Sequence, residues 1–218
     1  MYMFEIIFPK MHKEGQKILA IALVINFFLF FISEFLGLVG IVLCIWVFYF
    51  FRDPERFSIN DNSYLVSPAD GKISLITECK GPKELGLGEI DFVRISVFMN
   101  VFNCHVNRFP IDCSVDEIFY KPGKFLNASL DKASEDNERN MLKITSSNNE
   151  TLALVQIAGL VARRIVCEVN PGEKFTQGNR FGIIRFGSRV DLYFPNSYKV
   201  LSKVGQTVVA GESLIAKK

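Results

Sequence analysis

The sequence predicts a mainly β protein: a distorted sandwich-like or barrel-like β domain that follows an N-terminal, membrane-associated helical hairpin. Three features predict this fold class. Residues 18–51 form an apolar stretch whose only charge is Glu34, short segments rich in Val, Ile and Phe recur through the remainder, and Pro and Gly separate these segments. We therefore predict a hairpin with its linker over residues 1–56 and a β-rich domain over residues 57–218.

The apolar stretch is divided by Ser33-Glu34 into two runs, residues 18–32 and 35–51. Each run is shorter than the roughly 20 residues of a single spanning helix, so a pair of short helices that crosses the bilayer and a re-entrant hairpin both remain open. A cleaved signal peptide fits poorly, because no small-residue cleavage site follows the first run. Positive residues flank both ends, which favours both ends on the cytoplasmic side; they are Lys10, Lys13, Lys17, Arg52 and Arg56.

The remainder of the chain is expected to form short strands. The segments richest in Val, Ile and Phe are residues 92–102, 152–157, 164–169, 181–186 and 190–194. Turn signals such as Ser67-Pro-Ala-Asp-Gly71 lie between strands. Residues 127–140 are polar and lack apolar periodicity, which predicts a mobile surface loop.

Composition and charge exclude two classes of function. The 218 residues carry a net charge of only +2, without a basic stripe that has interleaved aromatic residues, so nucleic-acid binding is not expected. The 5 cysteines are scattered and include no C-x-x-C pair, which argues against a disulfide framework and a zinc site. Scattered cysteines are typical of a reducing compartment, so we expect a cytoplasmic β domain without a metal.

The dipeptide Gly187-Ser188 allows two interpretations. It can join two strands as a two-residue hairpin turn, with Gly at the position that needs positive φ. Alternatively, the serine hydroxyl attacks the carbonyl of the residue before it, and Gly suits that place because it lacks a Cβ and leaves the carbonyl open. Elimination from the resulting ester and loss of ammonia then give a pyruvoyl group at a new N-terminus. The dipeptide alone does not decide between them.

Five longer segments surround this dipeptide or lie upstream of it. They are residues 51–56 (FRDPER), 67–72 (SPADGK), 97–110 (VFMNVFNCHVNRFP), 156–165 (QIAGLVARRI) and 186–195 (FGSRVDLYFP). In this order and spacing they closely resemble the short, bacterial type of phosphatidylserine decarboxylase. The resemblance covers nearly the whole chain, including the apolar hairpin.

The resemblance implies a proenzyme that cuts itself between Gly187 and Ser188. The products are a large chain of residues 1–187 and a small chain of residues 188–218 that begins with a pyruvoyl cofactor made from Ser188. The two chains form a heterodimer, and the higher oligomeric state stays open. Val190, Leu192 and Phe194 alternate as in a half-buried strand, so the small chain should stay bound in the sheet.

The implied activity is that of a carboxy-lyase. Phosphatidylserine becomes phosphatidylethanolamine and carbon dioxide through a Schiff base between the substrate amine and the pyruvoyl group. Decarboxylation next to an amine needs such an electron sink, and the protein supplies orientation and proton transfer. The implied partners are phospholipid and the cell membrane, with the catalytic domain on the cytoplasmic side.

Acid–base candidates are few, because the chain has 2 histidines and His12 lies before the membrane segment. We expect His105 to activate Ser188 for cleavage and to move protons during decarboxylation. By resemblance, Asp70 orients His105 in an Asp-His-Ser arrangement, although Asp-Gly is also an ordinary turn pair. Longer members of the family carry a second histidine where this chain has Arg108, so it stays open whether His105 serves both tasks.

Two alternative functions remain. Residues 203–214 have the Gly-turn rhythm of biotinyl and lipoyl carrier domains, which would fit a membrane-anchored carrier module, but a modifiable Lys flanked by Met is missing. A pyruvoyl-dependent decarboxylase of a soluble amino acid would share the cleavage chemistry. The apolar hairpin argues against that enzyme, because a soluble substrate gives no reason to lie at a membrane.

Overall fold

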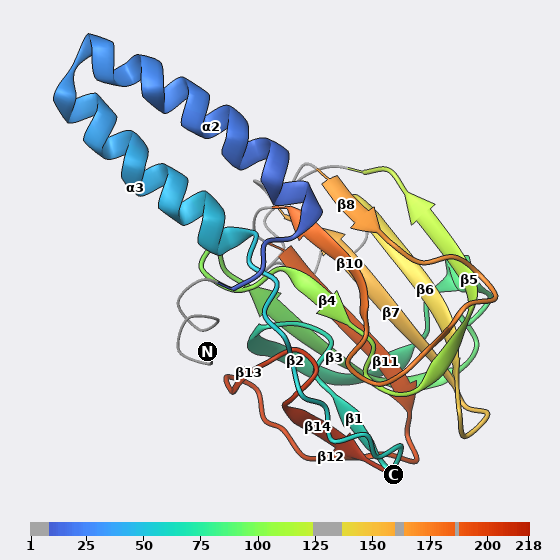
Figure 1. Ribbon diagram of the computed structural model, residues 1–218. Coiled ribbons are helices and arrows are strands. Elements are labelled where there is room, and N and C mark those ends of the chain that lie inside the picture. The colour runs from blue at the N-terminus through green and yellow to red at the C-terminus, as the bar shows by residue number, and fades with distance from the viewer. Residues whose placement is uncertain (1–8, 124–136, 160–163, 186–187) are drawn as a thin grey trace. The chain divides into compact units, whose positions relative to one another are not determined.

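The computed structural model describes residues 9–123, 137–159, 164–185 and 188–218, and it divides the chain into two compact units, Met1–Glu55 and Arg56–Lys218 (Figure 1). The first unit is helical, and the second consists mainly of strands. The helices are α2 (Lys13–Ile32), α3 (Glu34–Phe50) and the 3-10 helix η1 (Lys83–Leu85). The strands are β1 (Tyr64–Val66), β2 (Gly71–Lys80), β3 (Asp91–Met99), β4 (Val106–Arg108), β5 (Cys113–Lys121), β6 (Arg139–Ser146), β7 (Thr151–Ala158), β8 (Arg164–Cys167), β9 (Lys174–Phe175), β10 (Arg180–Arg185), β11 (Ser188–Pro195), β12 (Lys199–Val200), β13 (Thr207–Val208) and β14 (Leu214–Lys217).

The helical unit is a hairpin in which Ser33 alone separates α2 from α3. The two helices pack closely, because a side chain at Gly40 of α3 would overlap Asn26 of α2. The two ends of the hairpin are also tied together, since the His12 N–H donates to the Phe51 carbonyl at 2.8 Å. The predicted helical hairpin, with its break at Ser33-Glu34, is confirmed.

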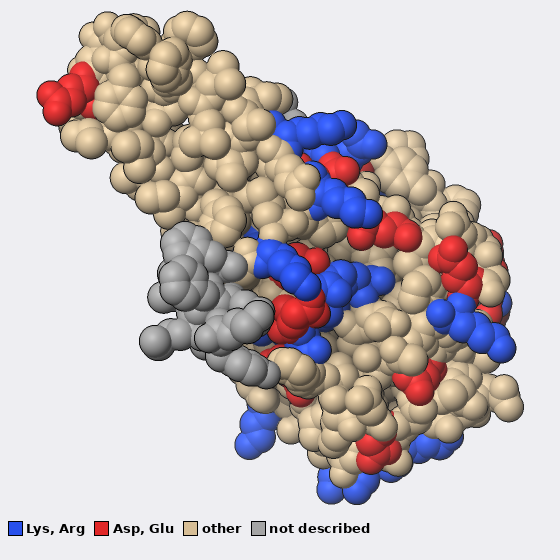
Figure 2. All heavy atoms as spheres, in the orientation of Figure 1, with Lys and Arg blue, Asp and Glu red and all other residues tan. Residues whose placement is uncertain are grey.

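The surface of this hairpin is apolar. Phe31 and Phe35 are 75% and 71% exposed, and only 11% of an apolar 18-residue segment of α2 is buried. This exposure argues against a hairpin that is buried in a protein core. By length and composition α2 can cross a membrane, and α3 is a shorter apolar helix of 17 residues. On the face in Figure 2 the helix pair is largely uncharged apart from the acid at its turn, whereas charges of both signs are interspersed on the β unit.

Among the described residues, the β unit contains one large sheet and two small ones. The large sheet has the strand order β13-β2-β3-β11-β7-β6-β5-β9, and the small sheets have the orders β4-β10-β8 and β1-β14-β12. All of these strand pairs are antiparallel. In Figure 1, β11 runs through the middle of the large sheet, flanked by β3 and β7.

The main hydrophobic core lies between the large sheet and the β4-β10-β8 sheet. It joins Val190 and Leu192 of β11 to Phe181 and Ile184 of β10. A second apolar cluster, which contains Tyr193, packs against the opposite face of β11. The mainly β, sandwich-like fold is therefore confirmed. The half-buried pattern expected for β11 is wrong, because residues 188–194 are buried on both faces.

The five predicted strands correspond to β3, β7, β8, β10 and β11, with ends that differ by a few residues. Strands β2, β5 and β6 were not predicted, because charged and hydroxyl residues interrupt their apolar pattern. The loop predicted over residues 127–140 is wrong at its end: Asn137 and Glu138 are buried, and Arg139 begins β6. Asn137 is held there by its side-chain amide, which donates to the Ala158 carbonyl at 2.7 Å. Residues 124–136 lie outside the described residues.

Candidate functional site

Ser188 lies where the chain changes sheets. It is the first residue of β11, and the chain reaches it from β10. Since β10 pairs with β4 and β8 while β11 pairs with β3 and β7, the two strands are not hydrogen-bonded neighbours. The interpretation of Gly187-Ser188 as a hairpin turn between paired strands is therefore wrong. Gly187 itself lies outside the described residues.

The Ser188 side chain is buried without a described partner. The residue is 0% exposed and pairs with Met99 of β3 and Ala158 of β7. Strand alternation places its side chain on the face of Val190, which is the face of the main core. Within the described residues its Oγ makes no hydrogen bond. Such burial costs about 1–3 kcal/mol, so a reactive role is a natural explanation for the hydroxyl.

His105 lies beside the strand that leads to Ser188. It directly precedes β4, is 0% exposed, and accepts a backbone hydrogen bond of 3.3 Å from Ile184 of β10. Its Nδ1 lies 3.0 Å from the carbonyl oxygen of Asn103. Because a carbonyl can only accept, Nδ1 carries the proton and Nε2 carries the lone pair in the neutral ring. This tautomer is the one that a general base acting through Nε2 requires.

Asp70 connects the two chains that cleavage would produce. Its Oδ2 accepts from Arg56 at 2.9 Å, and its Oδ1 accepts from the Ala210 N–H at 2.8 Å. Ala210 belongs to residues 203–214, the segment with the Gly-turn rhythm. These contacts give Asp70 a structural role in holding that segment against the turn before β2.

The turn that contains Asp70 also lies against the strand that follows His105. The Arg108 N–H of β4 donates to the Pro68 carbonyl at 2.9 Å. Directly after Asp70, a Cβ at Gly71 would overlap the Phe98 carbonyl oxygen, so only glycine allows β2 to begin so close to β3. The structure thus places the turn beside β4, and orientation of His105 by Asp70 stays a prediction.

Three buried amides form a chain on the core face of the large sheet, and sequence reasoning missed them. Nδ2 of Asn140 donates to Oε1 of Gln156 at 2.8 Å, and Nε2 of Gln156 donates to Oδ1 of Asn107 at 2.8 Å. Nδ2 of Asn107 then points to Sδ of Met99, at 3.6 Å. All three amides are at most 2% exposed. No sequence pattern distinguishes them from solvent-facing polar residues of a strand.

The opposite face of β11 carries paired charges. Arg189 and Asp191 are 3% and 0% exposed, and Nη2 of Arg189 donates to Oδ2 of Asp191 at 2.9 Å. The second contact, from Nε to Oδ1 at 2.8 Å, is an ion pair without hydrogen-bond alignment. Burial and the charge of Asp191 raise the pKa of Tyr193 to about 12. Burial opposes the charge of Arg94, but Asp191 and Tyr193 outweigh it and raise its pKa.

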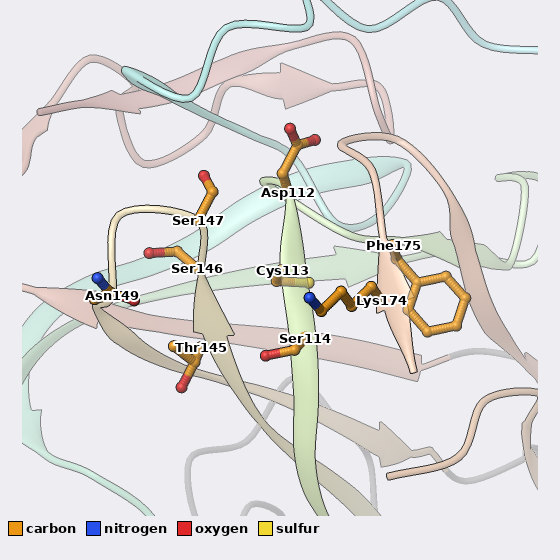
Figure 3. Close-up of a pocket in the computed structure, with 9 residues that line it drawn as sticks. All are labelled: Asp112, Cys113, Ser114, Thr145, Ser146, Ser147, Asn149, Lys174 and Phe175. Atoms are coloured by element: carbon orange, nitrogen blue, oxygen red, sulfur yellow. The ribbon is translucent and has the colours of Figure 1, made fainter. Parts of the chain in front are cut away.

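A cavity of about 310 Å³ lies at strands β5, β6 and β9, away from these residues (Figure 3). The cavity lies at the end of β6 that contains Thr145 and Ser146. Ser188 lies near the other end, because its partner Ala158 donates a backbone hydrogen bond to Glu138, which directly precedes β6. In Figure 3 the Lys174 side chain extends toward β5. The cavity is lined by Asp112, Cys113, Ser114, Thr145, Ser146, Ser147, Asn149, Lys174 and Phe175.

Comparison with known proteins decides the family. Residues 43–216 match the phosphatidylserine decarboxylase family. This chain belongs to that family. The phosphatidylserine decarboxylase proenzyme of Pelagibacter ubique is 62% identical over 216 residues, which cover 99% of this chain and 100% of the relative. Those of Cereibacter sphaeroides and Ruegeria pomeroyi are each 52% identical over 206 residues, which cover 94% of this chain and 89% and 94% of the relatives.

Membership of the phosphatidylserine decarboxylase family confirms the resemblance found in the sequence motifs. The match includes the segments that hold Asp70, His105 and Ser188. In structural terms, two of these residues are fully buried, and Asp70 is 8% exposed. All three lie in the β unit, Ser188 at the start of β11, His105 directly before β4 and Asp70 in the turn before β2.

Proposed function

We propose that this chain is a phosphatidylserine decarboxylase proenzyme that cuts itself between Gly187 and Ser188 and converts Ser188 into a pyruvoyl group. The mature protein then converts phosphatidylserine to phosphatidylethanolamine and carbon dioxide. The observation that carries the proposal is the Ser188 hydroxyl. In a member of this family, it is fully buried without a described partner, at the point where the chain changes sheets.

The strand register supports a cut at this place. Pairing of β11 with β3 and with β7 begins at Ser188 in both cases, so cleavage before Ser188 removes none of these pairs. After the cut, residues 188–218 still supply β11 and β13 to the large sheet and β12 and β14 to a small one. We therefore infer that the large and small chains remain together as a heterodimer.

The cleavage chemistry follows from the two residue types. Oγ of Ser188 forms a bond to the Gly187 carbonyl carbon and the peptide C–N bond breaks, which leaves an ester and a free amine on residue 188. Loss of the α-proton then breaks the Cβ–Oγ bond, leaving a carboxylate on Gly187 and dehydroalanine at residue 188. Addition of water and departure of ammonia leave a pyruvoyl group. A base is needed for the hydroxyl proton and again for the α-proton.

We propose His105 as this base. The Asn103 carbonyl fixes its proton on Nδ1, so Nε2 holds the lone pair that accepts the Ser188 proton. We propose that Asp70 helps to orient His105 from the turn before β2, because the Pro68 carbonyl of that turn accepts a backbone hydrogen bond from Arg108 of β4. In the later decarboxylation, Nε2 of His105 holds the proton that the substrate carbon receives after carbon dioxide departs.

Residue 188 also fits the cofactor that it would form. The pyruvoyl carbonyl supplies an electron sink for decarboxylation next to an amine. The side chain of residue 188 projects into the core beside Met99 and Ala158, and its oxygen is not committed to another described group. The pairing of β11 with β3 and with β7 holds residue 188 in position.

We further propose that the hairpin lies in the cell membrane with the β unit on the cytoplasmic side. The apolar surface of α2 and α3 fits a lipid environment. The backbone hydrogen bond between His12 and Phe51 holds the two ends of the hairpin together, so both leave the membrane on the same side. Positive residues flank both ends, as expected of the cytoplasmic side.

The direct test is an assay of the full-length protein on phosphatidylserine in mixed micelles, beside Ser188→Ala and His105→Ala. We expect release of carbon dioxide with an equal amount of phosphatidylethanolamine, and none from Ser188→Ala. His105→Ala should slow both self-cleavage and turnover by about 100-fold or more, because it removes the base. Normal cleavage and turnover by His105→Ala would remove the role assigned to His105.

A second substrate separates the alternatives. Activity on free serine equal to that on the lipid would favour a decarboxylase of a soluble amino acid. A wild-type chain that stays uncut and accepts a biotinyl or lipoyl group would favour a carrier module.

A further inference from the structure

We propose that Asn107 donates a hydrogen bond to Oγ of Ser188 during self-cleavage, and that Gln156 and Asn140 set the orientation of its amide. This inference rests on the proposed function and adds a hydrogen-bond donor to it. Asn107 would contact the reacting oxygen, whereas Gln156 and Asn140 are positioning residues that act through Asn107.

The contacts of Asn107 place its side chain over the start of β11. Its amide touches Met99 of β3 at 3.6 Å and Gln156 of β7 at 2.8 Å, and these strands flank β11 on either side. Met99 is paired with Ser188, and Gln156 is paired with Val190. Residues directly opposite each other in an antiparallel pair point to the same face. The Asn107 amide therefore bridges β11 at residues 188–190, on the face that carries the Ser188 hydroxyl.

The hydrogen bonds of the amide chain have one direction. Asn140 donates to Gln156, and Gln156 donates to Asn107, so the carbonyl oxygen of Asn107 is occupied. The Asn107 NH₂ group is thereby directed toward Met99. A thioether is a weak acceptor, so this donor can take a better one. A donor with a weak partner and a hydroxyl without a described partner lie at the same point of the fold.

Such a donor matches what the cleavage step needs. A serine hydroxyl can accept two hydrogen bonds and donate one. An N–H that donates to Oγ leaves the hydroxyl proton for the base and stabilises the negative charge that develops on Oγ as the base removes this proton. The hydrogen bond forms in the Ser188 rotamer that attacks, because Oγ makes no described hydrogen bond in the resting structure.

Three variants test this role through self-cleavage, without the need for a decarboxylation assay. Asn107→Leu removes the donor. Gln156→Glu replaces the Gln156 amide by a carboxylate, which can only accept hydrogen bonds. The Asn107 amide must then donate to it, so that the Asn107 oxygen turns toward Ser188. Gln177→Glu is the matched control. Gln177 is also a buried amide, 4% exposed, but it lies outside the chain of three amides, and its Nε2 donates to the Tyr64 carbonyl at 2.9 Å.

Full-length chains are made by cell-free synthesis with phosphatidylglycerol vesicles, and conversion to two chains is followed over time. We expect cleavage about 10- to 100-fold slower in Asn107→Leu and in Gln156→Glu at pH 8, but close to wild type in Gln177→Glu. As the pH falls, the carboxylate introduced by Gln156→Glu gains a proton and can again donate to Asn107. Gln156→Glu should therefore recover relative to wild type, whereas Asn107→Leu should not. Burial raises the pKa of such a carboxyl, which brings the recovery toward neutral pH.

Three results would overturn the inference: wild-type cleavage in both Asn107→Leu and Gln156→Glu, equal slowing in Gln177→Glu, or slowing of Gln156→Glu that pH does not change. The low-pH recovery also shows that Gln156→Glu is folded, so a folding failure of Asn107→Leu does not decide the matter. If the wild-type chain itself stays uncut, the proposed function fails instead.

Discussion

The two faces of β11 are both buried and both polar at the start of the strand, yet their polar groups are arranged in opposite ways. On one face, Arg189 and Asp191 neutralise each other at 2.9 Å. On the core face, Oγ of Ser188 has no described hydrogen bond, and Nδ2 of Asn107, a donor on the same face, points to a thioether. One face carries an ion pair, and the other carries a hydroxyl without a described hydrogen bond.

The ion pair on one face suits a positioning role, and the hydroxyl on the other face suits a reactive role. Removal of only one partner of a buried ion pair is strongly destabilising. The Arg189–Asp191 pair therefore ties the first residues of β11 to one arrangement. A hydroxyl that is already saturated with hydrogen bonds would have to lose them before it attacks a carbonyl. We infer that the paired face positions residue 188 while the core face keeps its oxygen free to react.

The largest expected effect on stability comes from breaking the ion pair. Asp191→Leu leaves the buried Arg189 guanidinium without this counter-charge, and we expect a loss of about 3–5 kcal/mol in the free energy of unfolding. Arg189→Met combined with Asp191→Leu removes both charges and should recover most of that loss. Urea unfolding in detergent, in an uncut Ser188→Ala background, measures both variants. A double variant as unstable as the single one would show that the pair is not the source of the effect.

A smaller effect is expected from Tyr193 at alkaline pH. Its pKa is raised from 10.0 to about 12 in the folded protein, by burial and by Asp191. Since the folded pKa is the higher one, the contribution of Tyr193 to stability is fully present below pH 10 and is lost as the pH rises toward 12. The loss is on the order of 1–3 kcal/mol.

Tyr193→Phe removes this titration, so its stability should fall less between these pH values than that of the parent. The measurement is the difference between the two proteins in urea midpoint as a function of pH. The buried thiol of Cys113, whose pKa is also raised to about 12, titrates in both proteins and cancels in the difference. Parallel curves for parent and variant would contradict the assignment.

The smallest effect is expected at Ser188. In the His105→Ala background, self-cleavage should be slow enough for the uncut chain to be isolated with and without the second change. There, Ser188→Ala should leave the free energy of unfolding unchanged or raise it by about 1 kcal/mol. The reason is that the hydroxyl gains no described hydrogen bond to offset its burial. Thermal unfolding of the two variants checks this. A clear decrease in Tm would mean that Oγ of Ser188 has a hydrogen-bond partner in the resting protein. The core face of β11 would then hold its polar groups as the face with the ion pair does.

Sequence motifs pointed to the residues that we propose as reactive, but not to their surroundings. Ser188 and His105 lie in motif segments, and the alternation of Val190, Leu192 and Phe194 predicted a strand. Local patterns do not encode which sheet a strand joins, because that depends on pairs such as Ser188 with Met99 that are distant in the chain. For this reason the change of sheet between β10 and β11 was not predicted.

The amide chain escaped prediction for a related reason. Asn107, Gln156 and Asn140 come from three strands, and a polar residue in a strand is ordinarily expected to face solvent. The packing of the β4-β10-β8 sheet over the large sheet buries these side chains and brings their amides together. The end of the predicted surface loop failed in the same way, since pairing with β7 draws Arg139 and Asn140 into the sheet.

The intact mass of the purified protein, measured beside that of Ser188→Ala, shows whether the chain cuts itself at Ser188. We predict two chains for the wild type, one ending at Gly187 and the other beginning with a pyruvoyl group at residue 188, and a single uncut chain for the variant. A single full-length chain from folded, membrane-bound wild-type protein would show that Ser188 is not a point of self-cleavage.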